Sequence, residues 1–169
     1  MKITSAQAAK VLRQLNNEHN TVLYKESSTR SFLASVGEDV ESVRPEYDYE
    51  ATQAKLDEIE TKIRKLKHAL NVFNSTTVIP EYDMTIDEML VYLPQLSQRC
   101  SKLSEMKDAI PKVRESAVYS RSSAIIDYRY ANYDIEKAEQ DHRDACNELA
   151  KAQTALDLIN NTAELEIDL

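Results

Sequence analysis

Apolar residues recur at alternating spacings of three and four along two long stretches of the chain. In the first stretch these residues are Leu56, Ile59, Ile63, Leu66, Leu70 and Phe73. In the second stretch they are Ala145, Leu149, Ala152, Leu156 and Ile159. This spacing puts the apolar side chains on one face of a helix, with a period close to that of knobs-into-holes packing. Each stretch follows an Asp that suits a helix N-cap and ends in an Asn-Ser or Asn-Thr cluster. The pattern therefore predicts amphipathic helices over 48–74 and 134–161.

The two stretches are parts of an internal duplication. Tyr47-Asp48-Tyr49-Glu50 returns 86 positions later as Tyr133-Asp134-Ile135-Glu136. Each copy is preceded by another amphipathic pattern, over about 4–29 and 85–110, in which Leu12-Arg13-Gln14-Leu15 matches Leu93-Pro94-Gln95-Leu96. Irregular arms, 30–47 and 112–133, separate the helices of each copy. The sequence thus predicts a helix-arm-helix unit that occurs twice, over about 4–77 and 85–162.

Four long helices joined in this way predict an all-α fold in a single domain, residues 1–169. The 169 residues include one Gly and four Pro, the residue types that favour tight turns, and this scarcity favours long helices. Short connections favour antiparallel neighbours, so we expect an up-down-up-down four-helix bundle with both arms at one end. Pro94 predicts a kink in the third helix or a helix start nearer to it. The alternating tail 163–169 predicts a short strand or an ordered extension.

Composition excludes several functions. Gly37 is the only glycine, whereas phosphate-binding loops and dinucleotide-binding motifs need two or three, and no Gly-x-Ser-x-Gly is present. We therefore expect no cofactor and no enzymatic activity. The net charge of −8 and the lack of a basic stripe argue against nucleic acid as a partner. No apolar run is long enough for a signal peptide or a membrane span, and two cysteines are too few for a disulfide framework, so we expect a cytoplasmic protein with no membrane partner.

The second arm carries the predicted binding site, formed by Arg121, Tyr128, Arg129 and Tyr130. Tyr, Ile and Ser in this stretch favour extended structure. In a strand, Tyr128 and Tyr130 share one face, with Asp127 and Arg129 on the other. We expect the arms to pair as a small hairpin or to add strands to a neighbouring subunit.

Two functions fit such an arm. Tyr and Arg are favoured at protein interfaces, which predicts a homo-oligomeric interaction protein. The same side chains could instead form an aromatic, cationic pocket that sequesters a small anionic ligand or signal.

A metal-binding helical bundle is a further alternative. In the predicted bundle His19, Cys100 and His142 fall near one layer, where they could hold zinc. The other interpretation is that they are semi-polar core residues, and we assign no metal site. Glu139-x-x-His142 has the spacing used by di-iron bundles, but such a site needs a second copy that this sequence lacks.

Several short motifs resemble those of small bacterial and phage helical proteins that are often labelled septicolysin. They are Leu70-Asn71-Val72-Phe73-Asn74-Ser75-Thr76-Thr77, Met84-Thr85-Ile86-Asp87-Glu88-Met89-Leu90, Tyr119-Ser120-Arg121-Ser122 with Ile125, Tyr133-Asp134-Ile135 and Ala155-Leu156-Asp157. The chain departs from that family at Ala124, where the family tends to have an acidic residue, and in having no Trp. The resemblance implies an all-helical fold but no catalytic residues. The family name implies a cytolysin, which the lack of an export signal and of a membrane-inserting segment disfavours.

Overall fold

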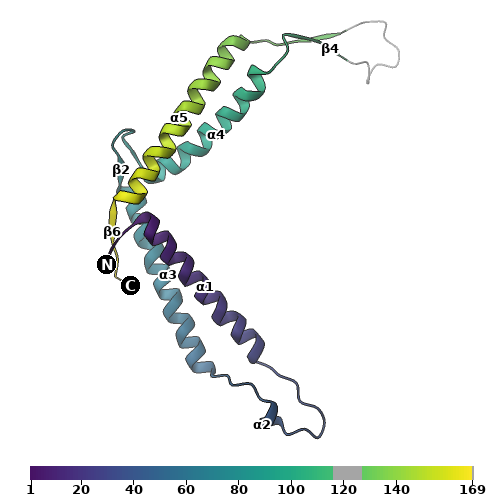
Figure 1. Cartoon of the computed structure of the whole chain (residues 1–169), viewed down its shortest axis with the longest axis vertical. Coiled ribbons are helices and arrows are strands. Elements are labelled where there is room, and N and C mark those ends of the chain that lie inside the picture. Colours follow the sequence, from purple (N-terminus) through teal and green to yellow (C-terminus); the bar gives the residue numbers. More distant parts are fainter. Residues whose placement is uncertain (116–126, 169) are drawn as a thin grey trace. The chain divides into compact units, whose positions relative to one another are not determined.

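The computed structural model describes residues 1–115 and 127–168, and it is mainly helical (Figure 1), which confirms the predicted class of fold. The chain divides into two compact units. Met1–Thr77 and Leu158–Leu169 form the first, and Val78–Asp157 forms the second. Each unit contains two long helices that are joined by an arm.

The first unit is organised around an antiparallel pair of long helices. In chain order it holds β1 (Lys2–Thr4), α1 (Ser5–Thr29), α2 (Val40–Val43), α3 (Tyr49–Thr76) and β6 (Glu164–Glu166). His19 of α1 contacts Glu60 of α3, whereas Glu26, further along α1, accepts a hydrogen bond from Gln53, which comes earlier in α3. The predicted stripe of α3 is the inner face: Leu56, Ile59, Leu66 and Phe73 are buried, and Ile63 and Leu70 are half-buried.

The second unit repeats this plan. It holds β2 (Val78–Ile79), β3 (Met84–Thr85), α4 (Ile86–Lys107), β4 (Lys112–Arg114), β5 (Tyr128–Tyr130) and the part of α5 (Ile135–Thr162) that precedes Leu158. Cys100 and Leu103 of α4 form a buried cluster with Ala145 of α5, against which Leu149 packs. The predicted stripe of α5 is therefore also an inner face. The third helix was expected over 85–110 but ends at Lys107, and it continues through Pro94.

In each unit, the strand that leads into the first helix is paired with a second short antiparallel strand. β1 pairs with β6, so that the buried Ile3 lies opposite the buried Leu165. β2 pairs with β3, so that the buried Ile79 lies opposite Met84. The tail was expected to form a short strand or an ordered extension, and it forms the strand β6, whereas no strand was predicted where β2 and β3 lie. The partner of β1 is thus the strand that follows α5, and the partner of β3 is the strand that follows α3.

Helix starts are set by side chains that accept hydrogen bonds from the first free backbone N–H groups. Thr4 and Gln7 form a capping box at α1, and Thr85 and Glu88 form the equivalent box at α4. Asp48 accepts from the Ala51 N–H at 3.0 Å, as predicted for an N-cap. Asp134 accepts from the Lys137 N–H at the same distance. These contacts satisfy donors that the helix leaves without a partner.

We expect Thr85→Ala to lower the free energy of unfolding by about 1 kcal/mol at neutral pH, because it removes the cap of α4. The backbone N–H and hydroxyl of Thr85 donate to the Glu88 carboxylate and lower its pKa from an ordinary value of 4.5. A lowered folded-state pKa means that the contribution of the ionised Glu88 carboxylate to stability, which is separate from that of the Thr85 cap, is present above pH 4.5 and is lost as the pH falls through the lowered value.

Urea unfolding followed by circular dichroism at pH 7 and at pH 3 measures both effects. Thr154→Ala is the matched control, since Thr154 lies exposed within α5, where its hydroxyl donates to the Ala150 carbonyl. This control should be neutral or slightly stabilising. A Thr85 variant as stable as the control at pH 7 would contradict the capping argument.

Two further findings bear on the sequence predictions. The first arm was expected to be a loop or extended, and it is irregular with one short helix, α2. Among the described residues, no helix combines the length and the apolar character that crossing a bilayer requires. The finer expectation of one four-helix bundle with both arms at one end concerns the two units together, and it stays a prediction.

Candidate functional site

The second arm is a β-hairpin whose strands are in a defined register. Lys112 lies opposite Tyr130, Val113 opposite Arg129 and Arg114 opposite Tyr128. Two more backbone bonds extend this ladder: the Glu115 N–H donates to the Asp127 carbonyl, and the Ala131 N–H donates to the Pro111 carbonyl. The second arm is thus extended at residues 112–114 and 128–130, as predicted, but its two strands pair with each other. The expectation that the two arms pair together stays a prediction.

One face of this hairpin is aromatic and cationic. Tyr128 and Tyr130 both lie on it, as their spacing predicts, with side chains that are 45% and 61% exposed. The Lys112 ammonium lies 4.1 Å from the centre of the Tyr128 ring and 5.3 Å from that of Tyr130. At these distances the cation is attracted to both ring faces. Arg114 lies opposite Tyr128 in the register and shares the face. We call Lys112, Arg114, Tyr128 and Tyr130 the tyrosine face.

The opposite face carries Val113 and Arg129. The Arg129 guanidinium forms an ion pair and a hydrogen bond with the Glu115 carboxylate. Its charge is therefore matched within the hairpin, on the face away from the tyrosines. Of the four predicted site residues, the structure brings Tyr128 and Tyr130 together, places Arg129 behind them, and does not describe Arg121, which lies outside the described residues.

Sequence reasoning missed Lys112 and Arg114 as site residues. Their position could have been suspected from the sequence, because residue types alternate along Lys112-Val113-Arg114 as they do along Tyr128-Arg129-Tyr130. Alternation alone did not show which residues of one strand lie opposite which residues of the other. Only the register places Lys112 beside the two tyrosines.

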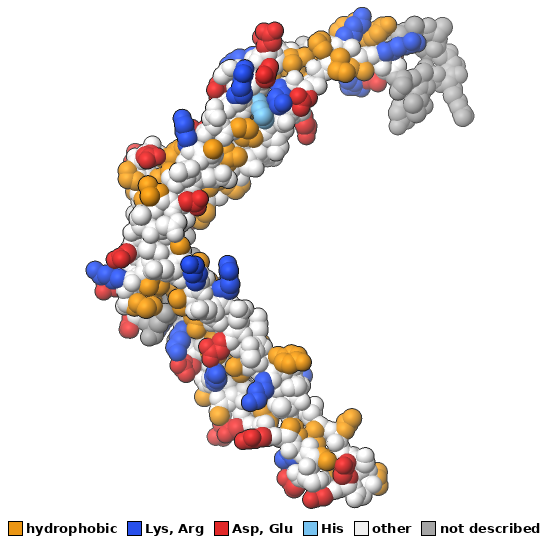
Figure 2. Space-filling view, in the orientation of Figure 1, with side chains coloured by type: hydrophobic (Ala, Val, Ile, Leu, Met, Phe, Trp, Pro, Cys, Tyr) orange, Lys and Arg blue, Asp and Glu red, His pale blue; other side chains and the backbone are white. Residues whose placement is uncertain are grey.

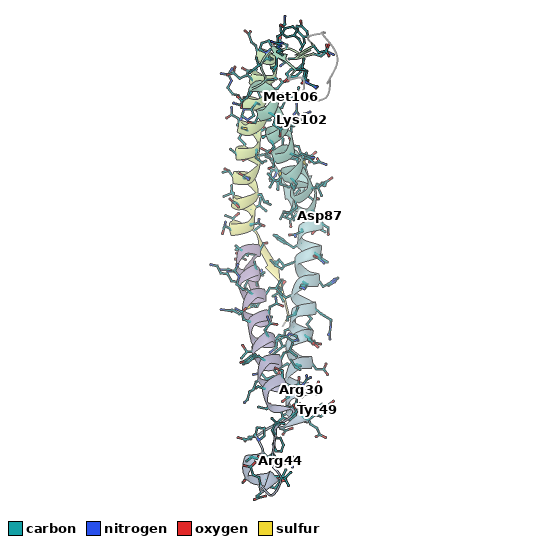
Figure 3. All side chains as sticks on the ribbon, turned by 90° about the vertical axis from the view of Figure 1, so that its right-hand side faces the viewer. Arg30, Arg44, Tyr49, Asp87, Lys102 and Met106 are labelled. Atoms are coloured by element: carbon teal, nitrogen blue, oxygen red, sulfur yellow. The ribbon has the colours of Figure 1, made fainter. Side chains whose placement is uncertain are left out.

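The hairpin is attached to the end of α4 by a side-chain contact. The Tyr133 hydroxyl donates to the Met106 carbonyl at 2.8 Å, in the last turn of α4. Met106 lies at the arm end of this unit (Figure 3). The same carbonyl accepts the backbone N–H of Ala109 at 3.3 Å, so the Tyr133 hydroxyl is an additional donor that fixes the exit of the hairpin.

The first arm returns to the helices of its own unit through Tyr47. Its hydroxyl donates to Glu26 of α1 at 2.8 Å, and this hydrogen bond raises the pKa of the phenol. Glu26 also accepts from Gln53 of α3. A groove of about 370 Å³ lies next to these hydrogen bonds, and its lining includes Lys25, Tyr47 and Lys55. Arg30 and Tyr49 lie where the two helices meet this arm, and Arg44 lies within it (Figure 3).

The histidines and cysteines do not form a metal site in the part of the chain that the structure describes. No three His, Cys, Asp or Glu side chains are grouped there so as to hold a metal ion. His19 contacts Glu60 at 3.0 Å, within the first unit. In the second unit, His142 Nε2 lies 3.5 Å from Cys146 Sγ. Burial, together with the neighbouring Cys146 thiol, raises the pKa of Cys100.

Comparisons with known proteins show a fold but no family. No protein-family model matches the chain, and no curated protein matches it. A crystal structure of a functionally unknown conserved protein from Corynebacterium diphtheriae is similar, with a TM-score of 0.61 and 18% sequence identity. The match covers 98% of this chain and 100% of that one. At this identity the likeness shows the fold alone, and the resemblance to proteins labelled septicolysin stays a prediction.

Proposed function

We propose that this protein is a non-enzymatic interaction protein that self-associates through the tyrosine face of its second arm. The observation that carries this proposal is the exposure of Tyr128 and Tyr130, two large side chains held side by side on an ordered strand. Figure 2 shows hydrophobic and basic side chains next to each other on this arm. Tyr is enriched at protein interfaces because it supplies a large, rigid contact area together with a polar group.

The backbone of the hairpin supports the same proposal. The sheet of β4 and β5 has two strands, so each strand leaves one edge without a partner strand within that sheet. Free edges of this kind are sites where another chain can add a strand. A hairpin of only two strands is also marginal in water by itself, and contact with a second chain would stabilise it.

A small anionic ligand is a second candidate for the same face. Lys112 and Arg114 give the tyrosine face two cations, and the aromatic rings offer stacking surface. Native mass spectrometry of freshly purified protein separates the two candidates. Extra mass that is released on denaturation would favour the ligand, and an oligomer without extra mass would favour self-association.

The decisive test is the double variant Tyr128→Ala/Tyr130→Ala, with subunit number measured by sedimentation equilibrium. We expect the dissociation constant of the oligomer to rise at least about 100-fold, because central interface tyrosines each contribute about 2 kcal/mol when truncated.

Tyr24→Ala/Tyr49→Ala is the matched control, since both of its tyrosines are exposed on helices of the first unit. The control should assemble like the unchanged protein. Helical circular dichroism checks that both variants fold. A folded Tyr128/Tyr130 variant with an unchanged oligomer would refute the proposal.

A further inference from the structure

The first arm exposes aliphatic side chains that contact little of their own chain. Leu33 is 95% exposed, Val36 is fully exposed and Val40 is about half exposed. Single exposed apolar residues are ordinary on protein surfaces. Here three such residues fall within eight positions of one arm, and apolar side chains that gather on a surface commonly mark interaction sites.

A defined turn presents Val36. The Glu38 N–H donates to the Ser35 carbonyl at 3.1 Å, and the Glu38 carboxylate accepts from the Ser35 N–H at 2.9 Å. Gly37 has φ of 91°, a conformation that suits the third position of a type II turn and that other residues rarely adopt. Local hydrogen bonds therefore define the turn that carries Val36, and none of the described residues covers its side chain.

Charge distinguishes this arm from the second one. Residues 30–47 contain four acids, Glu38, Asp39, Glu41 and Glu46, against two bases, Arg30 and Arg44. Residues 111–133 contain four bases against two acids. Acidic and hydrophobic side chains occur together on the first arm (Figure 2). One arm is thus acidic and aliphatic, and the other is basic and aromatic.

We propose that the first arm of one copy docks on the tyrosine face of the second arm of another copy. Leu33 and Val36 would cover the exposed tyrosine rings, and the carboxylates around Glu38 would lie near Lys112 and Arg114. Opposite charges at an interface steer association and fix the register of the partners. In a two-fold dimer this contact occurs twice, because each copy supplies one arm of each kind. This inference rests on the proposed function and names the partner surface for it.

The first test is Leu33→Ser/Val36→Ser. Because these side chains are exposed, the variant loses almost no packing within its own chain and should keep its helical circular dichroism. We expect the dissociation constant of the oligomer to rise at least about tenfold in sedimentation equilibrium. Val91→Ser/Leu158→Ser is the matched control, since it replaces two aliphatic residues that are exposed on α4 and α5, and it should leave assembly unchanged.

Mixing two deficient variants tests the pairing of the arms directly. Leu33→Ser/Val36→Ser keeps an intact tyrosine face, and Tyr128→Ala/Tyr130→Ala keeps an intact first arm. At a concentration between the dissociation constant of the unchanged protein and those of the two variants, neither variant should assemble alone, but their mixture should form a heterodimer with one intact contact. Native mass spectrometry identifies this species if one variant carries an isotope label.

Each other outcome decides against the inference. If the Leu33/Val36 variant assembles normally while the Tyr128/Tyr130 variant does not, the proposed function stands and the docking of the first arm is wrong. If both variants fail alone and the mixture also fails, the arms do not pair with each other. If both assemble normally, or if the unchanged protein is monomeric at all concentrations, both proposals are wrong.

Discussion

Leu66→Ala is expected to lower the free energy of unfolding by about 2–5 kcal/mol, the largest effect that we predict for a single substitution. Leu66 is completely buried on α3, in the face that packs against α1. Truncating it removes the transfer free energy of the buried carbon atoms and leaves a cavity that the two helices can fill only in part. A pair of helices has few other layers to compensate, so the loss should be a large share of the total stability.

Urea unfolding followed by helical circular dichroism measures this loss. Val72→Ala is the control on the same helix, since the Val72 side chain is about half exposed. Its effect should stay within about 0.5–1 kcal/mol. Equal losses for the two variants would mean that Leu66 does not contribute to a packed core.

Ala152→Leu is expected to lower the free energy of unfolding by about 1–3 kcal/mol, through overpacking. Ala152 is completely buried on α5, so a larger side chain there must be accommodated inside the helix contact. Three more methylene-sized groups at this position require neighbouring side chains or the helix backbone to shift. The intrinsic helix propensities of Ala and Leu are similar, so the loss reports packing and not helix formation.

Ala150→Leu provides the control, because Ala150 is exposed on the same helix, two residues away. The same substitution there should change the stability by no more than about 0.5 kcal/mol. Thermal and urea unfolding of the two variants separate the effects. A stabilised Ala152→Leu variant would show that the helix contact contains unfilled space.

The helices could be predicted because their signal is local and repeated. Ile59 and Leu66, or Ala145 and Ala152, lie on the inner face through spacing alone, since the period of the helix is fixed by its backbone bonds. The caps Asp48 and Asp134 were equally readable, because a capping side chain acts on N–H groups within three residues of itself. Each of these interactions is complete within a few turns of one helix.

The strands were harder to predict because short strands depend on their partners. β2 and β3 have two residues each, too few for an alternating pattern. β1 is paired with β6 from the opposite end of the sequence, a contact that no local pattern indicates. The tail was the exception, because Leu165 and Ile167 alternate with acidic residues.

The candidate site shows the same division between local and non-local information. That Tyr128 and Tyr130 share a face follows from the strand period alone, and so does the place of Arg129 on the other face. The position of Lys112 near both rings, and the pairing of Arg129 with Glu115, follow from the register between the two strands, which residues 115–127 connect. A connection of that length imposes no particular register, unlike a two-residue turn.

The sequence by itself determined the helical class, the duplicated helix-arm-helix plan, the inner faces of α3 and α5 and the aromatic character of the second arm. These features depend on backbone periodicity and on contacts between residues close in the chain. The tertiary structure decided which helices pair within each unit, which strands meet, and which cations accompany the exposed tyrosines. Those choices depend on side chains brought together from distant parts of the chain, where packing and pairing geometry select among several arrangements that local preferences allow.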